Sequence, residues 1–271
     1  MRDVGGFDHN AHTLRTLTRI EQAYPGHVGL NLSWETLEGL AKHNGPIHRP
    51  NWALAEIDRD FPLDLATWPS LEAQVAAVAD DIAYDNHDID DGLRAGLLTI
   101  ADVREVPLVD QGWQKVSARY PGETEDSLAR ELVREQIGLM VNDVIDETRR
   151  RIAEARPGSA DAVRLAGRPL AGFSEGLAAQ ERALKQFMYA RLYRRPRQIE
   201  ISQHAATVIA GLAERYMSYP DLLPNHWRAS LPPQEPERSR HIGDFIAGMT
   251  DRYALSRYRE VVGPIEMPDG F

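Results

Sequence analysis

Three side chains that can bind a metal, a phosphate or a sugar recur every four residues within segment 78–91. They are Asp80, Tyr84 and Asp88. At 3.6 residues per turn, this spacing places them along one stripe of a helix. Carboxylates bind cations and accept sugar hydroxyls, and a phenol can donate to a phosphate. A solvated acidic face is the simpler explanation of such a charge run, although the aromatic ring of Tyr84 is less expected there.

A second group of candidate binding residues occupies segment 183–197. Lys185, Tyr189 and Tyr193 share a stripe of a predicted helix. Four arginines gather near its C-terminal end, namely Arg191, Arg194, Arg195 and Arg197. Such a cluster could clamp a polyphosphate. It also complements the negative end of the helix dipole, so a purely structural role is equally consistent.

Two histidines, His9 and His12, lie three residues apart near the N-terminus. On a helix they could bind a metal or act as an acid. A single helical histidine is more often a structural residue, and the spacing alone leaves both interpretations open.

The elements that must position these residues are helices, because apolar residues recur with helical periodicity through most of the chain. Helices are predicted over 7–24, 33–41, 69–86, 92–98, 123–155, 174–193, 198–218 and 237–260, with Ser33 and Ser70 as N-caps. Segments 45–68 and 99–122 are predicted to be irregular. Only weak strand patterns occur, near 163–165 and 198–201. The sequence therefore predicts one all-α unit spanning 1–271.

Composition narrows the possible functions. The formal charge of −10 opposes nonspecific binding to nucleic acid. The chain has no cysteine, which excludes disulfides and thiolate metal sites and leaves His, Asp and Glu as the strong metal ligands. It has neither a membrane-spanning apolar run nor a secretory signal, so we expect a cytoplasmic protein with no membrane partner. Glycine-rich phosphate loops and GxSxG or HExxH motifs are absent from the sequence.

Longer blocks of sequence carry a family resemblance. The blocks are GGFDHNAHTLRTLTRIE, GLNLSWETLEGLAKHNGP, SLEAQVAAVADDIAYDNHDIDDGLRAG, ALKQFMYARLYRRPR and DFIAGMTDRYAL. In this order, and over nearly the whole chain, they resemble blocks of the bacterial dGTP triphosphohydrolase-like proteins of the HD superfamily. The resemblance implies an HD-domain-type helical bundle. Residues 1–100 would be the remainder of the HD catalytic core, and 101–271 a C-terminal helical subdomain.

The resemblance also implies an activity and residue roles. Such proteins hydrolyse a dNTP to a deoxynucleoside and inorganic triphosphate, use a divalent metal (Mg²⁺ or Mn²⁺) and tend to form homo-oligomers. By position in the family blocks, Asp80 would be a metal ligand and His9 a catalytic histidine. The substrate-binding residues would be Tyr84, Asp88, Lys185, Tyr193 and Arg191.

One departure from the family pattern affects the predicted activity. The family's first His, its His-Asp doublet and a glycine- and histidine-rich segment precede the GGFDHN block, which begins here at Gly5. His87-Asp88 is the only His-Asp string, and it belongs to the downstream block. We therefore expect an N-terminally truncated chain that lacks three of four metal ligands and is weakly active or inactive.

Two other functions remain open at the level of sequence. The first is a non-catalytic helical module that binds nucleotides or subunits. The second is a helical protein that binds nucleic acid through the arginines of segment 191–197, which the net charge of −10 disfavours.

Overall fold

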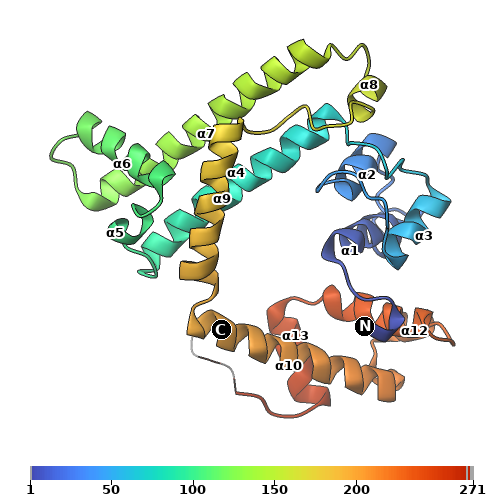
Figure 1. Ribbon diagram of the computed structural model, residues 1–271. Coiled ribbons are helices and arrows are strands. Elements are labelled where there is room, and N and C mark those ends of the chain that lie inside the picture. Colours follow the sequence, from blue (N-terminus) through green and yellow to red (C-terminus); the bar gives the residue numbers. More distant parts are fainter. Residues whose placement is uncertain (1, 267, 269–271) are drawn as a thin grey trace. The chain divides into compact units, whose positions relative to one another are not determined.

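The computed structural model describes residues 2–266 and 268, and its elements are helical (Figure 1). No residue in these ranges forms a strand, which confirms the predicted all-α class. The chain forms two compact units. The larger spans Thr13–Tyr193, and the smaller joins the residues up to His12 with those from Arg194 onward. The boundary predicted near residue 100 falls inside the larger unit and stays a prediction.

The larger unit is built around three long helices. Its elements are η2 (Thr16–Ile20), α2 (Trp34–Ala41), α3 (Trp52–Asp60), α4 (Leu71–Arg94), α5 (Ile100–Val103), α6 (Pro107–Arg119), α7 (Glu125–Ala155), α8 (Ala160–Arg164), α9 (Glu175–Met188) and η3 (Tyr189–Tyr193). Helix α1 (His9–Arg15) begins in the smaller unit and ends in the larger. Helices α4 and α6 pack on α7, and α9 crosses α4 (Figure 1).

The core of the larger unit lies where α4, α7 and α9 meet. Ile89 of α4, Leu132 and Met140 of α7, and Leu184 of α9 are fully buried in one cluster. Burial of a side chain of this size contributes about 1.5–3 kcal/mol. The helical spacing of these residues turns one face of each helix inward, and the polar faces that carry the candidate residues are left at the surface.

The helix starts follow from local sequence. Ser33 and Ser70 cap α2 and α4 as predicted, accepting hydrogen bonds from the backbone N–H groups of Thr36 (3.3 Å) and Ala73 (3.2 Å). Each cap satisfies a donor that the first helical turn leaves free.

Several predicted boundaries were wrong. Segment 45–68 contains α3, whose N-cap Asn51 accepts from Leu54 N at 2.9 Å. Segment 99–122 contains α5 and α6, which start at a Thr99–Asp102 capping box and at Pro107. The predicted helix 92–98 is the end of α4 followed by a turn. For α3, α5 and α6, a capping residue or an N-terminal proline starts a helix too short to show a long apolar repeat.

Three other predictions also need correction. The helix predicted over 237–260 is two helices, α12 (Glu237–Ala247) and α13 (Asp251–Val261), because Thr250 caps a new start. The weak strand patterns near 163–165 and 198–201 fall mainly in α8 and in α10 (Pro196–Ser218). The helix predicted over 7–24 is α1, followed by a wider π-helical turn, η2, that ends at Ile20.

The smaller unit is a cluster of short helices on α10. Beside α10, α12 and α13 it contains η1 (Arg2–Val4), η4 (Pro220–Leu222) and α11 (Asn225–Ala229). Leu212, Tyr216 and Ile242 are fully buried in its core. The N-terminal segment joins this unit through α12: Arg240 Nε donates to Val4 O at 3.0 Å, and His12 Nδ1 lies 3.3 Å from Asp244 Oδ1.

Candidate functional site

The candidate residues of the larger unit gather on the facing surfaces of α4 and of α9 with its extension η3. Tyr84 and Asp88 come from α4, and Lys185 and Tyr193 from α9 and η3. Tyr193 Oη donates a hydrogen bond to Asp88 Oδ2, and the rings of Tyr84 and Tyr193 lie 6.4 Å apart. Side chains separated by about a hundred residues of sequence are thus brought together.

Tyr193 is held as a protonated phenol. Its half-buried position, together with the acceptor Asp88, raises the pKa of the phenol well above its usual range. The hydroxyl therefore stays a donor at neutral pH, and the carboxylate stays an acceptor. The exposed ring of Tyr84 lies beside this pair and offers an apolar face to a ligand.

Lys185 lies between acidic residues of both helices. Its Nζ is 2.7 Å from Asp81 Oδ1 of α4 and 2.5 Å from Glu181 Oε1, one turn earlier on α9. Burial alone would lower the pKa of the ammonium, but these two carboxylates outweigh it and raise the pKa. Lys185 is consequently a fixed positive charge. Sequence reasoning missed Asp81 and Glu181 as its partners.

Asp85 is an acid buried beneath this surface. Asp85 is 3% exposed to solvent, and its Oδ2 atom has no hydrogen-bond partner among the described residues. Burial raises the pKa of the carboxyl to about 7, against the opposing effect of Lys185; the nearby carboxylates Glu181, Asp81 and Asp88 add to the rise. Asp85 therefore exists near neutral pH as a mixture of the acid and the carboxylate.

Asp80, the predicted metal ligand, is exposed, and His43 is its neighbour. His43 Nε2 lies 3.7 Å from Asp80 Oδ2. His43 follows the end of α2, and a buried ion cluster holds that end: Lys42 Nζ donates to Glu38 Oε1 (2.9 Å), and Arg164 Nε donates to the same oxygen (3.0 Å). Sequence reasoning missed His43, although it stands in the quoted block that ends HNGP.

These donors do not make up a metal site by themselves. Across residues 2–266 and 268, no three or more His, Asp or Glu side chains are grouped so that they could hold an ion. A divalent cation such as Mg²⁺ needs near-octahedral coordination by about six ligands, and the pair Asp80–His43 supplies two. The metal-binding role of Asp80 stays a prediction.

Arg191 and His9 are the remaining predicted residues. Arg191 Nη2 pairs with Glu105 at 2.8 Å, and its guanidinium lies 5.9 Å from the ring of Phe187. His9 is an exposed residue at the start of α1, in the smaller unit, where Asp8 caps the helix by accepting from Ala11 N at 2.8 Å. Their predicted roles remain predictions.

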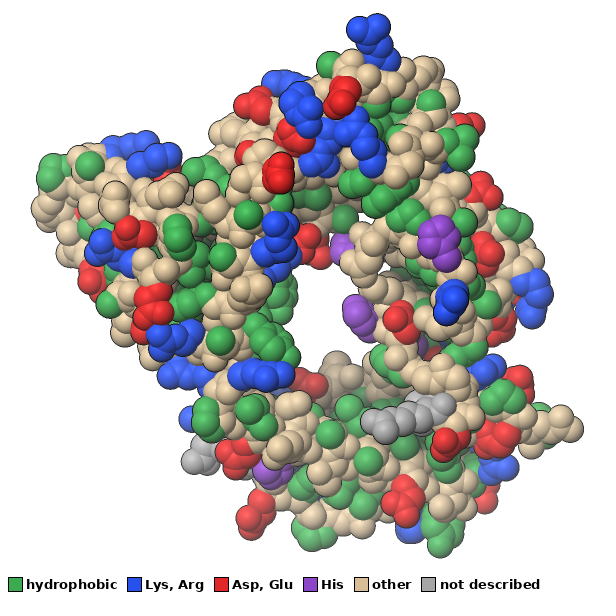
Figure 2. Space-filling model, viewed as in Figure 1, with side chains coloured by type: hydrophobic (Ala, Val, Ile, Leu, Met, Phe, Trp, Pro, Cys, Tyr) green, Lys and Arg blue, Asp and Glu red, His purple; other side chains and the backbone are tan. Residues whose placement is uncertain are grey.

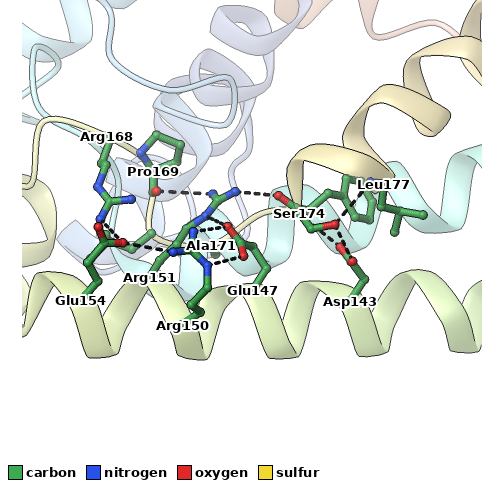
Figure 3. A network of polar contacts seen from close by, with 12 residues as sticks. Asp143, Glu147, Arg150, Arg151, Glu154, Arg168, Pro169, Ala171, Ser174 and Leu177 are labelled. Carbon is green, nitrogen blue, oxygen red and sulfur yellow. Dashed lines mark hydrogen bonds and ion pairs between the residues drawn. The ribbon is translucent and has the colours of Figure 1, made fainter.

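The beginning of α9 is fixed by α7 (Figure 3). Asp143 accepts hydrogen bonds from Ser174 N (2.8 Å) and Ser174 Oγ (2.7 Å). Arg151 Nη2 donates to Phe173 O at 2.6 Å, and Glu147 Oε1 accepts from Arg151 Nε at 2.7 Å. Figure 2 shows basic and acidic side chains interleaved over the C-terminal part of α7. This network positions the helix that carries Lys185.

None of the helices in the described part of the chain combines the length and apolar character of a membrane span.

Comparison with known proteins gives one consistent family. Residues 171–260 match the phosphohydrolase-associated domain. The chain is 49% identical over 236 residues to a deoxyguanosinetriphosphate triphosphohydrolase-like protein of Parvibaculum lavamentivorans, and 46% identical over 238 residues to one of Brucella canis. Each match covers 84% of this chain and 60% or 59% of the relative, so the chain spans about three-fifths of their length. The resemblance predicted from the sequence is confirmed.

Proposed function

Because this chain is homologous to the deoxyguanosinetriphosphate triphosphohydrolase-like proteins over 84% of its length, we propose that its α4–α9 surface binds a deoxynucleoside triphosphate. The reaction would be hydrolysis to a deoxynucleoside and inorganic triphosphate. The single observation that carries this proposal is the meeting of Tyr84, Asp88, Lys185 and Tyr193 on two adjacent helices.

The chemistry of these groups suits the parts of such a substrate. The Lys185 ammonium binds phosphate oxygens, since it stays protonated between its two carboxylates. The Tyr193–Asp88 pair offers acceptor oxygens to a sugar hydroxyl, because the one phenol proton is already donated to Asp88. The exposed ring of Tyr84 packs against the sugar or the phosphate end.

Metal-assisted hydrolysis, with Mg²⁺ or Mn²⁺, belongs to the proposal for the whole protein. Asp80 and His43 are too few to hold an ion alone. Weak or absent hydrolysis by this chain, with binding retained, is the expected behaviour. Release of triphosphate from dGTP with Mn²⁺, abolished by Asp80→Ala, would contradict that expectation.

Binding of dGTP, measured by titration calorimetry in Mn²⁺ and in EDTA, tests the proposed site. Lys185→Ala should weaken binding by about tenfold or more, because a charge-assisted hydrogen bond is worth about 1.5–3 kcal/mol. Lys115→Ala is the matched control, since Lys115 is a half-exposed lysine on α6 paired with Glu135 at 3.7 Å. Equal affinities of both variants and the wild type would refute a site on α4 and α9.

A non-catalytic nucleotide- or subunit-binding module is the alternative, and the two-residue donor set at Asp80 favours it. Binding without turnover, with or without added Mn²⁺, would support the module. Homo-oligomerisation is part of either proposal, and sedimentation with and without dGTP measures it. We do not expect salt-sensitive binding of single-stranded DNA at a net charge of −10.

A further inference from the structure

The two carboxylates that hold Lys185 differ in their exposure to solvent. The side chain of Glu181 is 10% exposed, and that of Asp81 is 53% exposed. Glu181 lies one turn before Lys185 on the same helix, whereas Asp81 reaches across from α4. The ammonium therefore has one buried partner on its own helix and one exposed partner on the neighbouring helix.

This difference predicts which partner a ligand can replace. An ammonium has three donors, and two of them point at carboxylates here. An exposed ion pair contributes little to stability, so an incoming anion replaces it readily. Glu181 is harder to displace, because it is buried and would be left as a charge without its partner.

We propose that Asp81 is a displaceable stand-in for phosphate, and that Glu181 is the residue that positions Lys185. The Asp81 carboxylate stays paired with the Lys185 ammonium until a phosphate oxygen replaces it. Competition from Asp81 therefore lowers the affinity of the site for polyphosphate. The inference rests on the proposed function, since it assigns Lys185 to the phosphate. It adds that Asp81, in the site without ligand, competes with the substrate for the Lys185 ammonium.

The surroundings of Lys185 support this division of roles. When Asp81 moves away, Glu181 remains at 2.5 Å, and the ammonium keeps a buried counter-charge. Asp81 has solvent to move into because it lies on the exposed side of α4. Its release therefore requires no change in the packed core formed by Ile82, Ile89 and Leu184.

Three acid-to-amide variants test the proposal, with inorganic triphosphate and dGTP as probes. Asp81→Asn should tighten binding by about fivefold, since it removes an exposed competing ion pair. Glu181→Gln should give no gain or a loss, because the ammonium loses its positioning partner. Asp91→Asn, an exposed acid at the far end of α4, should leave the affinity unchanged. All three remove one negative charge, so a general electrostatic effect would tighten all three alike.

A second measurement follows Lys185 directly. The chain has only three lysines, Lys42, Lys115 and Lys185, so selective ¹³C labelling of lysine gives three side-chain signals. We expect triphosphate to shift the Lys185 signal and not the Lys115 signal, and Asp81→Asn to shift the Lys185 signal without ligand. Glu181→Asp, which keeps the charge, guards against misfolding of Glu181→Gln.

Unchanged affinity of Asp81→Asn, with normal binding by the wild type, would overturn the inference and leave the proposed function intact. Equal tightening by Asp81→Asn and Glu181→Gln would overturn the division of roles. If neither the wild type nor Asp81→Asn binds triphosphate or dGTP, the proposed function itself fails, and the inference fails with it.

Discussion

The two ends of α9 use the same kinds of charged and polar groups in opposite ways. At its N-terminal end, Asp143 and Arg151 of α7 bind Ser174 and the Phe173 carbonyl (Figure 3). Arg151 and its partner Glu147 are 16% and 11% exposed. Near the C-terminal end, Lys185 and Asp81 are 40% and 53% exposed. One end is anchored by shielded groups, and the other carries groups open to solvent.

Solvent access makes the difference between an anchor and a binding group. At the anchored end, Arg150 and Arg151 lower the pKa of Glu147 to about 2, so this carboxylate stays ionised at any ordinary pH. At the open end, water and dissolved anions compete for each charge. A rigid attachment at one end lets the exposed end exchange partners without moving the helix.

The largest expected effect comes from breaking the anchor. Arg151→Ala removes the donor to the Phe173 carbonyl and leaves Glu147 with one partner fewer. We expect a loss of about 2–4 kcal/mol in the free energy of unfolding, measured by urea denaturation. Arg149→Ala on the same helix is the control, because Arg149 is 78% exposed and its pair with Asp146 spans 3.9 Å. Equal, small losses for both variants would mean that the anchored end is no more rigid than the open end.

The next effect concerns the buried acid at the open end. The pKa of Asp85 is raised to about 7 in the folded protein, against about 3.9 in an unfolded chain. Its contribution to stability is therefore full below about pH 4 and is lost as the pH rises toward 7. From pH 5 to 8 the wild type should lose on the order of 2 kcal/mol of unfolding free energy relative to Asp85→Asn. Parallel stability–pH curves for the two proteins would show that Asp85 is not held as an acid.

A smaller effect is expected from the tyrosine that meets α4. Tyr193→Phe removes the hydrogen bond to Asp88 and should cost about 1 kcal/mol of unfolding free energy. It should also weaken dGTP binding several-fold, because Asp88 loses the hydrogen bond that orients its carboxylate. Tyr120→Phe, at the end of α6, is the matched control. If Tyr193→Phe weakens dGTP binding no more than Tyr120→Phe does, Tyr193 has only a structural role near the C-terminal end of α9.

The smallest effect is expected at an exposed ion pair in the segment that follows α9. Arg191 and Glu105 are 49% and 54% exposed, so Arg191→Ala should leave the unfolding free energy almost unchanged. Thermal unfolding at low and high salt measures this change, which should vanish at high salt. A loss of unfolding free energy comparable to that of Arg151→Ala would show that the two ends of α9 do not differ in this way.

The sequence predicted features that depend on neighbouring residues in the chain. It missed the contacts that depend on residues from other helices. Helix α4 was predictable because Ser70 caps it and its apolar residues repeat with helical spacing. The four-residue spacing places Asp80, Tyr84 and Asp88 on one side of α4, each about 40° further round the helix than the one before. Helix α3 was missed because its nine residues carry only three buried apolar side chains, within a stretch rich in Pro, Asp and Asn.

The ion pairs of the site could not be predicted in the same way. Lys185 meets Asp81 across 104 residues of sequence, and no local pattern fixes how α4 and α9 align. His43 beside Asp80 likewise depends on how α2 is held by Glu38, Lys42 and Arg164. The pattern of each helix indicates which face is polar. The partner on the neighbouring helix is decided by packing.

The π-helical turn η3 has a consequence for insertions and deletions. In a regular α-helix, residues eight apart lie about 80° from alignment, whereas residues seven apart lie within about 20°. A turn with i→i+5 bonds takes in one additional residue, so it brings Tyr193 back toward the side of Lys185 although eight positions separate them. Loss of one residue from 189–193 would restore a regular helix with the same alignment, whereas gain of one would rotate the phenol away from the lysine. The length of this segment, more than the identity of its residues, sets which groups a ligand meets together.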